Sequence, residues 1–150
     1  MLREHFYTLF FSVAVISVIL GCSPLSMDEK EAQKVFNDFY TDNVPESIND
    51  RHLLNAGKAI VPYLITEIQK EDMPKRGYAA LALGKIGDRR ALPVLIRMYE
   101  NPTLMGIPPG VLLTAIWHID PKLGEELASK YKGGDEFMNR TIELLRKGII

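Results

Sequence analysis

The chain has 150 residues, with 18 lysines and arginines against 19 aspartates and glutamates, a net charge of −1 and one cysteine. This length favours a single domain. The balanced charge argues against nucleic-acid binding, which depends on a clustered excess of Lys and Arg. One cysteine cannot form an intramolecular disulfide or build a cysteine-rich metal site.

The first residues are typical of an export signal. Arg3 lies in a short polar start, and the stretch from Phe6 to Leu20 is rich in apolar residues and has no charge. This stretch is shorter than the ~20 residues that an α-helix needs to cross a bilayer, but it suits the apolar region of a signal peptide. Gly21 and then Cys22 follow directly.

The stretch Ile19-Leu20-Gly21-Cys22 resembles the lipobox of bacterial lipoproteins. In that family the cysteine thiol receives diacylglycerol, and a dedicated signal peptidase cuts before the cysteine. The resemblance implies a signal peptide over residues 1–21, a lipidated Cys22 with a tether over residues 22–25, and a mature domain over residues 26–150. It implies a lipid-anchored protein of the cell envelope. Ser23 resembles the residue found in lipoproteins sorted to the periplasmic side of the Gram-negative outer membrane. The alternative is an ordinary signal peptide or a short membrane anchor with an incidental cysteine.

The mature chain is predicted to be all-α, because no stretch shows the alternation of a β-strand. Ser26 stands three residues before Glu29, which is the spacing of a capping box at a helix start. Apolar residues then follow at helical spacing, namely Ala32, Val35, Phe36, Phe39 and Tyr40. Pro45 suits the first turn of a next helix, and Gly57 fits its C-terminal cap.

The segment from residue 76 to residue 99 predicts two helices joined by a tight turn. The first helix carries a face of small and aliphatic residues, Ala79, Ala80, Leu83 and Ile86. Gly87 allows the chain to turn, and Asp88 can accept N–H bonds at the start of the second helix. The second helix has a buried stripe of Leu92, Leu95, Ile96 and Tyr99, and Pro93 lies near its first turn.

This hairpin resembles a HEAT repeat of the short form first recognised in phycobilisome lyases; the matching runs are residues 79–88 and 91–96. Residues 60–65 align with residues 91–96, and residues 112–120 align with residues 79–87. One hairpin cannot bury its own apolar face, so companion repeats are needed. The resemblance implies three repeats over about residues 46–132, which form a short α-α superhelix (a HEAT-like solenoid). Helices over residues 26–40 and after Asp135 would cover its two ends. Asp120 and Asp135 are predicted to accept N–H bonds at the starts of the helices that follow them.

The sequence contains no catalytic motif such as G-x-S-x-G, a P-loop or H-E-x-x-H. His118 and Asp120 are two residues apart, so on a helix they point to different faces and cannot share a ligand. We therefore expect no catalytic residues, no cofactor and no metal. Transfer of lyase chemistry to this chain would depend on the fold alone.

Binding surfaces are the remaining candidates. In the HEAT family the second helices line the concave face, and the alignment stacks Tyr63 with Val94 and Glu126, and Thr66 with Arg97 and Ser129. The partner-binding residues that we predict are Tyr63, Thr66, Val94, Arg97, Met98, Glu126, Ser129 and Lys130. The loop over residues 101–110 carries Leu104, Met105 and Ile107, for which folding over the helix ends is favoured above a docking patch. Lys85, Arg89 and Arg90 form a basic cluster, either a surface turn or a contact for lipid headgroups.

These features predict a lipid-anchored, non-catalytic protein–protein interaction module, a HEAT-repeat scaffold or adaptor in the bacterial cell envelope. Its partners would be another envelope protein and, through the lipid anchor, the membrane. Nucleic acid and metal are not expected as partners. One alternative is a lyase-type or chaperone role in handling a small cofactor. The other is a purely structural spacer in the envelope.

Overall fold

The computed structural model describes residues 27–41, 51–101 and 106–150. These residues form eight α-helices and two short 3-10 helices, and they contain no strand, which confirms the all-α prediction for the described part of the chain. The predicted signal peptide, Cys22, the tether, Ser26 and Pro45 lie outside the described residues. The helices are α1 (Glu29–Thr41), α2 (Arg51–Ala56), η1 (Gly57–Ala59), α3 (Val61–Glu67), α4 (Arg76–Ile86), η2 (Arg89–Ala91), α5 (Leu92–Glu100), α7 (Pro109–Ile119), α8 (Pro121–Lys130) and α9 (Glu136–Arg146).

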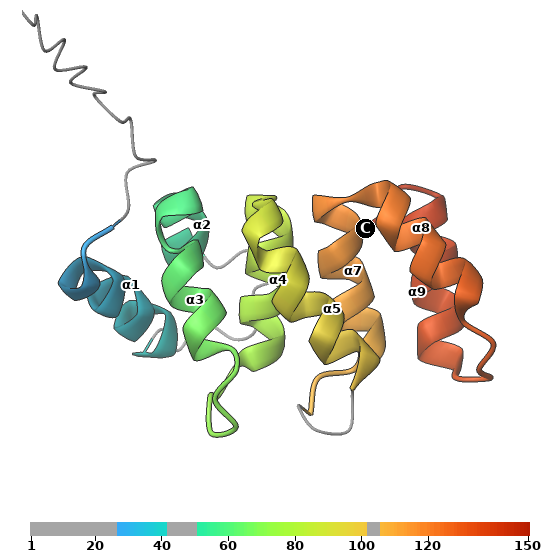
Figure 1. Ribbon diagram of the computed structural model, residues 1–150, viewed down its shortest axis with the longest axis horizontal. Coiled ribbons are helices and arrows are strands. Elements are labelled where there is room, and N and C mark those ends of the chain that lie inside the picture. The colour runs from blue at the N-terminus through green and yellow to red at the C-terminus, as the bar shows by residue number, and fades with distance from the viewer. Residues whose placement is uncertain (1–26, 42–50, 102–105) are drawn as a thin grey trace, which may run out of the picture.

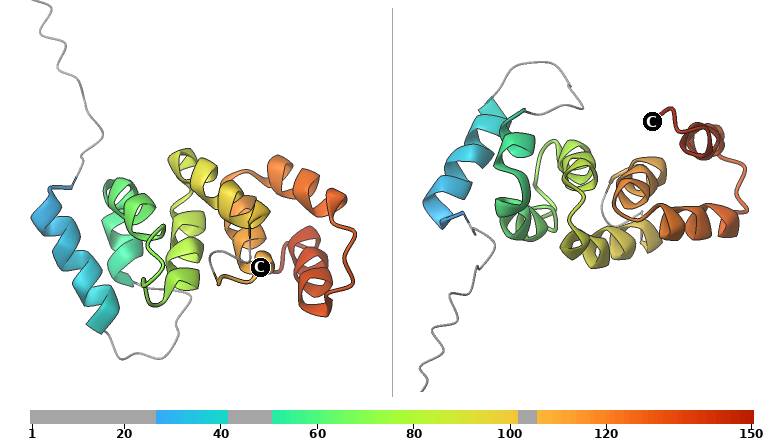
Figure 2. Two further views of the ribbon diagram at one scale, coloured as in Figure 1. Left: turned by 60° about the horizontal axis from the view of Figure 1, so that its bottom comes forward. Right: turned by 90° about the horizontal axis from the view of Figure 1, so that it is seen from above.

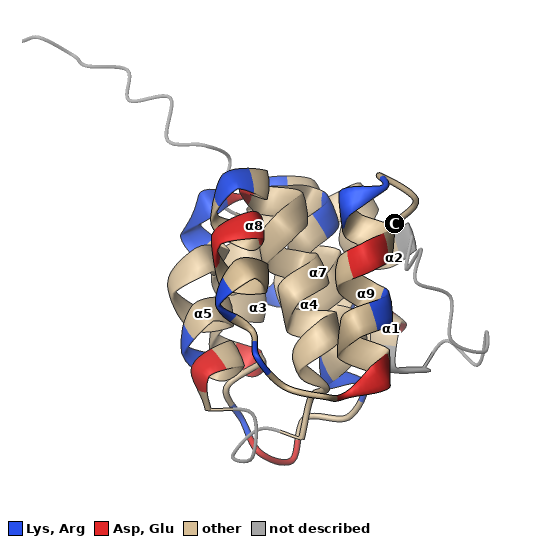
Figure 3. Cartoon of the chain, turned by 90° about the vertical axis from the view of Figure 1, so that its right-hand side faces the viewer, with Lys and Arg blue, Asp and Glu red and all other residues tan. Residues whose placement is uncertain are grey.

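The helices stack side by side as a row of hairpins, with α1 at one end and α9 at the other (Figure 1). The hairpins α2/α3, α4/α5 and α7/α8 correspond to the three predicted repeats. Seen from above and from the end, α3, α5 and α8 form one layer, while α4, α7 and α9 belong to the other (Figures 2 and 3). We call the layer of α3, α5 and α8 the second-helix layer.

The α4/α5 hairpin forms as its sequence predicts. Gly87 has a φ of +71°, and its N–H donates to the carbonyl oxygens of Leu83 and Gly84 at the end of α4. A side chain with a Cβ is disfavoured in this left-handed conformation, which is why glycine ends the helix here. The carboxylate of Asp88 then accepts the N–H of Arg90 at 2.9 Å, so it caps the short helix η2, which leads directly into α5.

Aspartates also start the last two helices. The Asp120 side chain accepts the N–H of Leu123 at 3.1 Å, and Pro121 occupies the first helical position of α8. Asp135 accepts the N–H of Met138 at 2.7 Å at the start of α9. Both caps confirm the sequence prediction. At the start of α1, the Asp28 side chain accepts the N–H of Glu31 at 2.8 Å.

One apolar core runs through the stack from α1 to α7, and a smaller cluster joins α7 and α8 to α9. Within the larger core, α4 and α7 make the most extensive contact of any two helices. Gly84 permits this approach, since a Cβ added there would lie 2.6 Å from the Cα of Ala115. The smaller cluster consists of Leu113, Ala128, Met138, Ile142 and Leu145.

Arginines of the α4/α5 turn connect the three hairpins. Arg90 Nη2 donates to the backbone oxygen of Lys58, in the turn of the hairpin before, at 2.9 Å. Arg89 Nη2 lies 2.7 Å from Oδ2 of Asp120, in the turn of the hairpin after. The three turns are therefore neighbours along one edge of the molecule, the upper edge of Figure 1.

Candidate protein-interaction surface

The second-helix layer carries all eight predicted partner-binding residues, and six of them reach the surface. Five are exposed, and Tyr63 is half-buried. The exposed residues are Thr66, Arg97, Glu126, Ser129 and Lys130. Each of the three hairpins contributes at least one of these side chains, so the layer presents a mixed polar surface across the stack.

The prediction is wrong for Val94 and Met98. Their exposed fractions are 4% and 0%, and both belong to the larger core. The two residues are four apart on α5 and share one stripe, and α5 packs against α7 of the next hairpin. The stacking of repeats therefore covers this stripe, which removes both side chains from any partner surface.

Tyr63 contacts the amino-terminal helix. Its hydroxyl donates to Oε1 of Gln33, and its ring meets the ring of Phe36 at a centroid distance of 5.4 Å and an interplanar angle of 67°. Burial raises the pKa of the Tyr63 hydroxyl above its ordinary value. Edge-to-face aromatic pairs contribute about 0.5–1.5 kcal/mol beyond burial. Tyr63 thus helps to hold α1 against the first hairpin.

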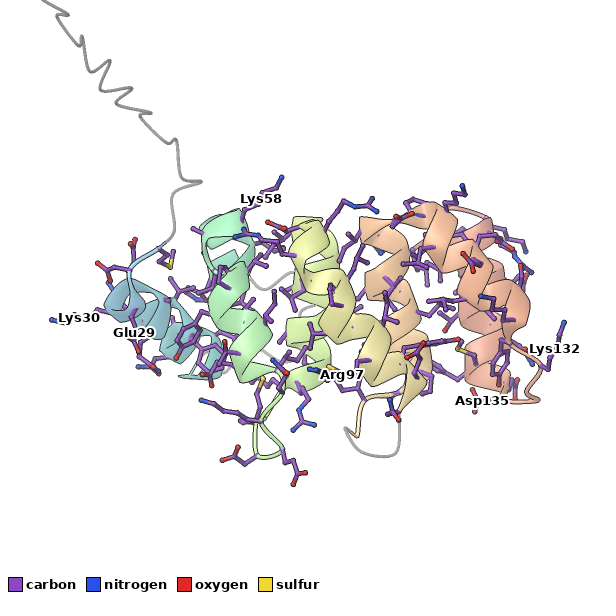
Figure 4. All side chains as sticks on the ribbon, viewed as in Figure 1. Glu29, Lys30, Lys58, Arg97, Lys132 and Asp135 are labelled. Atoms are coloured by element: carbon purple, nitrogen blue, oxygen red, sulfur yellow. The ribbon has the colours of Figure 1, made fainter. Side chains whose placement is uncertain are left out.

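Arg97 also makes a contact between neighbouring hairpins. Its guanidinium donates to Oε1 of Gln69, which follows α3, and Figure 4 shows Arg97 beside that part of the chain. Thr66 instead turns back on its own helix, where Oγ1 donates to the carbonyl oxygen of Pro62 at 3.3 Å. The alignment of the repeats with one another does not identify Gln69, because Gln69 and Arg97 come together only when the hairpins stack.

The α8 part of the layer consists of paired charges. Lys130 lies 2.6 Å from Oε1 of Glu126, and Ser129 Oγ donates to Glu125 at 2.7 Å. Arg146 of α9 binds both oxygens of Glu125, at 2.6 and 3.0 Å. This guanidinium, with a smaller contribution from Ser129, lowers the pKa of Glu125 to about 2. Sequence spacing gave no indication of the Glu125–Arg146 pair, which joins two helices.

A shallow hollow of about 380 Å³ lies between α8 and α9. Its lining includes one aromatic side chain, Tyr131, together with Asn139, Glu143, Arg146 and Lys147. Glu143 accepts hydrogen bonds from Lys147 and, at 3.2 Å, from Arg140. The charged groups of this hollow are thus engaged with one another or with Glu125.

The other sequence candidates divide between buried and paired residues. Ile107 is 3% exposed, so it folds into the core as expected, while Leu104 and Met105 lie outside the described residues. Arg90 makes a hydrogen-bonded ion pair with Asp88 at 2.7 Å, which lowers the pKa of that carboxyl. Within the described ranges, no group of three metal-ligating side chains comes together, and no helix has the length and apolarity for a membrane span.

The α4/α5 hairpin is the part of the chain that matches a known family of repeats. Residues 75–101 match the family model described as PBS lyase HEAT-like repeat. The chain contains a HEAT-like repeat. The match covers α4, η2 and α5, and the hairpins on either side of this HEAT-like repeat have the same helix–turn–helix layout. Comparison with curated proteins and with solved structures found no significant match.

Proposed function

We propose that this helical repeat protein is a lipid-anchored interaction module that binds another protein of the bacterial cell envelope and catalyses no reaction. The observation that carries the proposal is the second-helix layer, in which side chains from three successive hairpins share one exposed face. This face consists mainly of Thr66, Arg97, Glu126, Ser129 and Lys130. Stacked repeats provide extended surfaces of this kind for binding proteins.

The charges of this layer suit a protein partner. The pair Lys130–Glu126 has side chains that are 68% and 58% exposed. Exposed ion pairs contribute only about 0–1 kcal/mol each, so a partner that offers its own charges can replace them at small cost. A standard interface buries about 800 Å² on each partner, which an extended layer can supply without a pocket.

The lipobox supports the anchor. Cys22 is the only cysteine in the chain and follows the charge-free apolar stretch at the position where lipoproteins are modified. Each buried CH₂ of an acyl chain contributes about 0.8 kcal/mol, and more than one chain gives lasting attachment. Met27, the first described residue, is five residues beyond Cys22, so an anchored domain would lie close to the bilayer.

The cofactor-handling alternative predicts a deep pocket lined by polar and aromatic groups. The hollow between α8 and α9 has a single aromatic side chain, and its charged groups are engaged in pairs. No observation on the described residues favours this alternative. A structural spacer differs from the proposed module only in lacking a specific partner, so the experiment must look for that partner.

The test combines photocrosslinking in intact cells with mass spectrometry of the native chain. A photoreactive amino acid replaces Thr66 or Ser129, with Arg140 on the opposite layer as the control position. We expect Thr66 and Ser129 to crosslink to the same protein and Arg140 not to. Absence of a protein partner from all three positions would contradict the module.

A diacylglyceryl mass on Cys22, and release of the folded domain from membranes by Cys22→Ala, would support the anchor. A Cys22→Ala chain that stays with membranes would contradict it.

A further inference from the structure

The edge formed by the three intra-hairpin turns is cationic. We call it the turn edge and define it by its seven charged residues, five cations and two carboxylates: Lys58, Lys85, Asp88, Arg89, Arg90, Asp120 and Lys122. The interactions of Arg90 with Lys58 and of Arg89 with Asp120 show that these turns are contiguous. Lys58 points away from the domain at this edge (Figure 4).

Within the turn edge the positive charges face outward. The side chains of Arg89 and Arg90 are 71% and 44% exposed, whereas those of their partners Asp120 and Asp88 are 18% and 10% exposed. Both aspartates point their oxygens at helix N–H groups, which holds them inward. A negatively charged surface laid along this edge would therefore meet guanidinium and ammonium groups before any carboxylate.

The opposite edge, formed by the connections between hairpins, has the other sign. Its described residues carry six carboxylates against four cations, one of which is the buried Arg76. The carboxylates are Glu67, Glu71, Asp72, Glu100, Asp135 and Glu136, and the other cations are Lys70, Lys75 and Lys132. We call it the loop edge. Figure 3 shows Lys and Arg gathered along the upper edge and much of the Asp and Glu along the lower one. The near-zero net charge of the chain thus conceals a separation of charge across the domain.

From this separation we propose that the turn edge lies against an anionic phospholipid surface, with the loop edge directed away from it. The proposal rests on the proposed membrane attachment, which determines the source of the negative charge. The chain from Cys22 to Met27 extends by at most about 18 Å, so an anchored domain stays near the headgroups. The Debye length at physiological ionic strength is about 8 Å, so attraction acts when the tethered domain brings the turn edge within about that distance of the headgroups.

The expected strength follows from the number of exposed cations. Each Lys or Arg near an anionic bilayer strengthens binding about fivefold. Removal of three cations of the turn edge should therefore weaken docking about a hundredfold. The variant is Lys58→Gln/Arg89→Gln/Lys122→Gln. The matched control, Lys70→Gln/Arg97→Gln/Lys132→Gln, removes the same charges from exposed positions outside the turn edge.

The experiment measures hydrogen exchange of the full chain on vesicles of phosphatidylcholine alone or mixed with phosphatidylglycerol. We expect phosphatidylglycerol to slow exchange in the three turns and to leave the loop edge unchanged. High salt and the turn-edge variant should abolish the effect, and the control variant should keep it. A melting curve for each variant checks that it is folded.

Equal exchange on both vesicles, or slowed exchange at the loop edge, would overturn the proposal. The proposal would also be overturned if the turn edge crosslinks to an acidic protein in cells and phosphatidylglycerol does not change its hydrogen exchange. Flotation with pure phosphatidylcholine vesicles, together with the mass of Cys22, reports the anchor separately. If the chain does not float with those vesicles, the anchor is wrong, and flotation with phosphatidylglycerol vesicles then tests the turn edge by itself.

Discussion

The middle of the stack and its carboxyl-terminal end are held by different forces. Where α4 meets α7, the helices approach so closely that Gly84 has no room for a Cβ beside the backbone of Ala115. Where α8 meets α9, half-exposed side chains make the link, since Arg146 and Glu125 are 49% and 44% exposed. A middle hairpin is therefore fixed by packing on both sides, whereas an end helix depends in part on polar bonds.

Substitutions that create a cavity should show the largest difference between the middle of the stack and its carboxyl-terminal end. Leu112→Ala in the larger core should lower the free energy of unfolding by about 3 kcal/mol, because Leu112 is 0% exposed and its neighbours on both sides are fixed. Leu145→Ala in the smaller cluster should cost about 1 kcal/mol less, since the end helix can move to close the space. Urea unfolding measures both values. Equal losses would mean that the end is packed as rigidly as the middle.

Glycine substitutions test the close approach directly. Gly84→Ala should destabilise the protein by about 2 kcal/mol, because a methyl group meets the backbone of the neighbouring helix. At Gly110 the added methyl meets mainly the ring of Phe137, which is 55% exposed and can move, so Gly110→Ala should cost less than about 1 kcal/mol.

Gly77→Ala is the control for helix propensity on α4. Its nearest neighbour would be Val111 Cγ1 at 3.9 Å, an ordinary contact. This change should stabilise the protein by up to about 1 kcal/mol, as Gly→Ala does in an open helix position. Melting curves of the three variants give the order, and a Gly84→Ala protein as stable as Gly77→Ala would refute the tight contact.

Removal of helix caps should show a smaller difference between the middle of the stack and its end. Asp88→Ala removes both the cap of η2 and the ion-pair partner of Arg90, so we expect the free energy of unfolding to fall by about 2 kcal/mol. Asp135→Ala removes a cap at the exposed end and should cost about 1 kcal/mol. Thermal unfolding compares them. A larger loss of stability in Asp135→Ala than in Asp88→Ala would contradict this expected order.

Acid should loosen the end helix. The pKa of Glu125 falls from 4.5 to about 2 when Arg146 binds it, so its contribution is complete above pH 4.5 and is lost as the pH falls toward 2. Both side chains are about half exposed, and solvent screening makes this the smallest of the four effects. Hydrogen-exchange protection of α9 should fall over this range. In Glu125→Gln it should already be low at neutral pH and depend less on pH, while Glu136→Gln should behave as the natural chain.

The local signals of the sequence predicted much of the fold. Asp88, Asp120 and Asp135 cap helices, and Gly87 ends one, because each of these roles depends on the backbone within a few residues. The candidate surface was harder to predict. Whether Val94 faces solvent or the core depends on the position of α7, which no property of α5 specifies. The bond from Arg97 to Gln69 and the pair Arg146–Glu125 likewise join helices that are brought together only by stacking.

The serial arrangement of the hairpins has a mechanical consequence. In such a stack each unit contacts mainly its neighbours, so a pulling force applied along it passes through every junction in turn. If the chain is held at its amino-terminal end and pulled from its carboxyl-terminal end, the same tension acts on the α4/α7 and α8/α9 junctions. Because α9 is the last element and its pair with α8 is half-exposed, we expect α9 to detach from α7 and α8 first, while the hairpins behind it stay assembled.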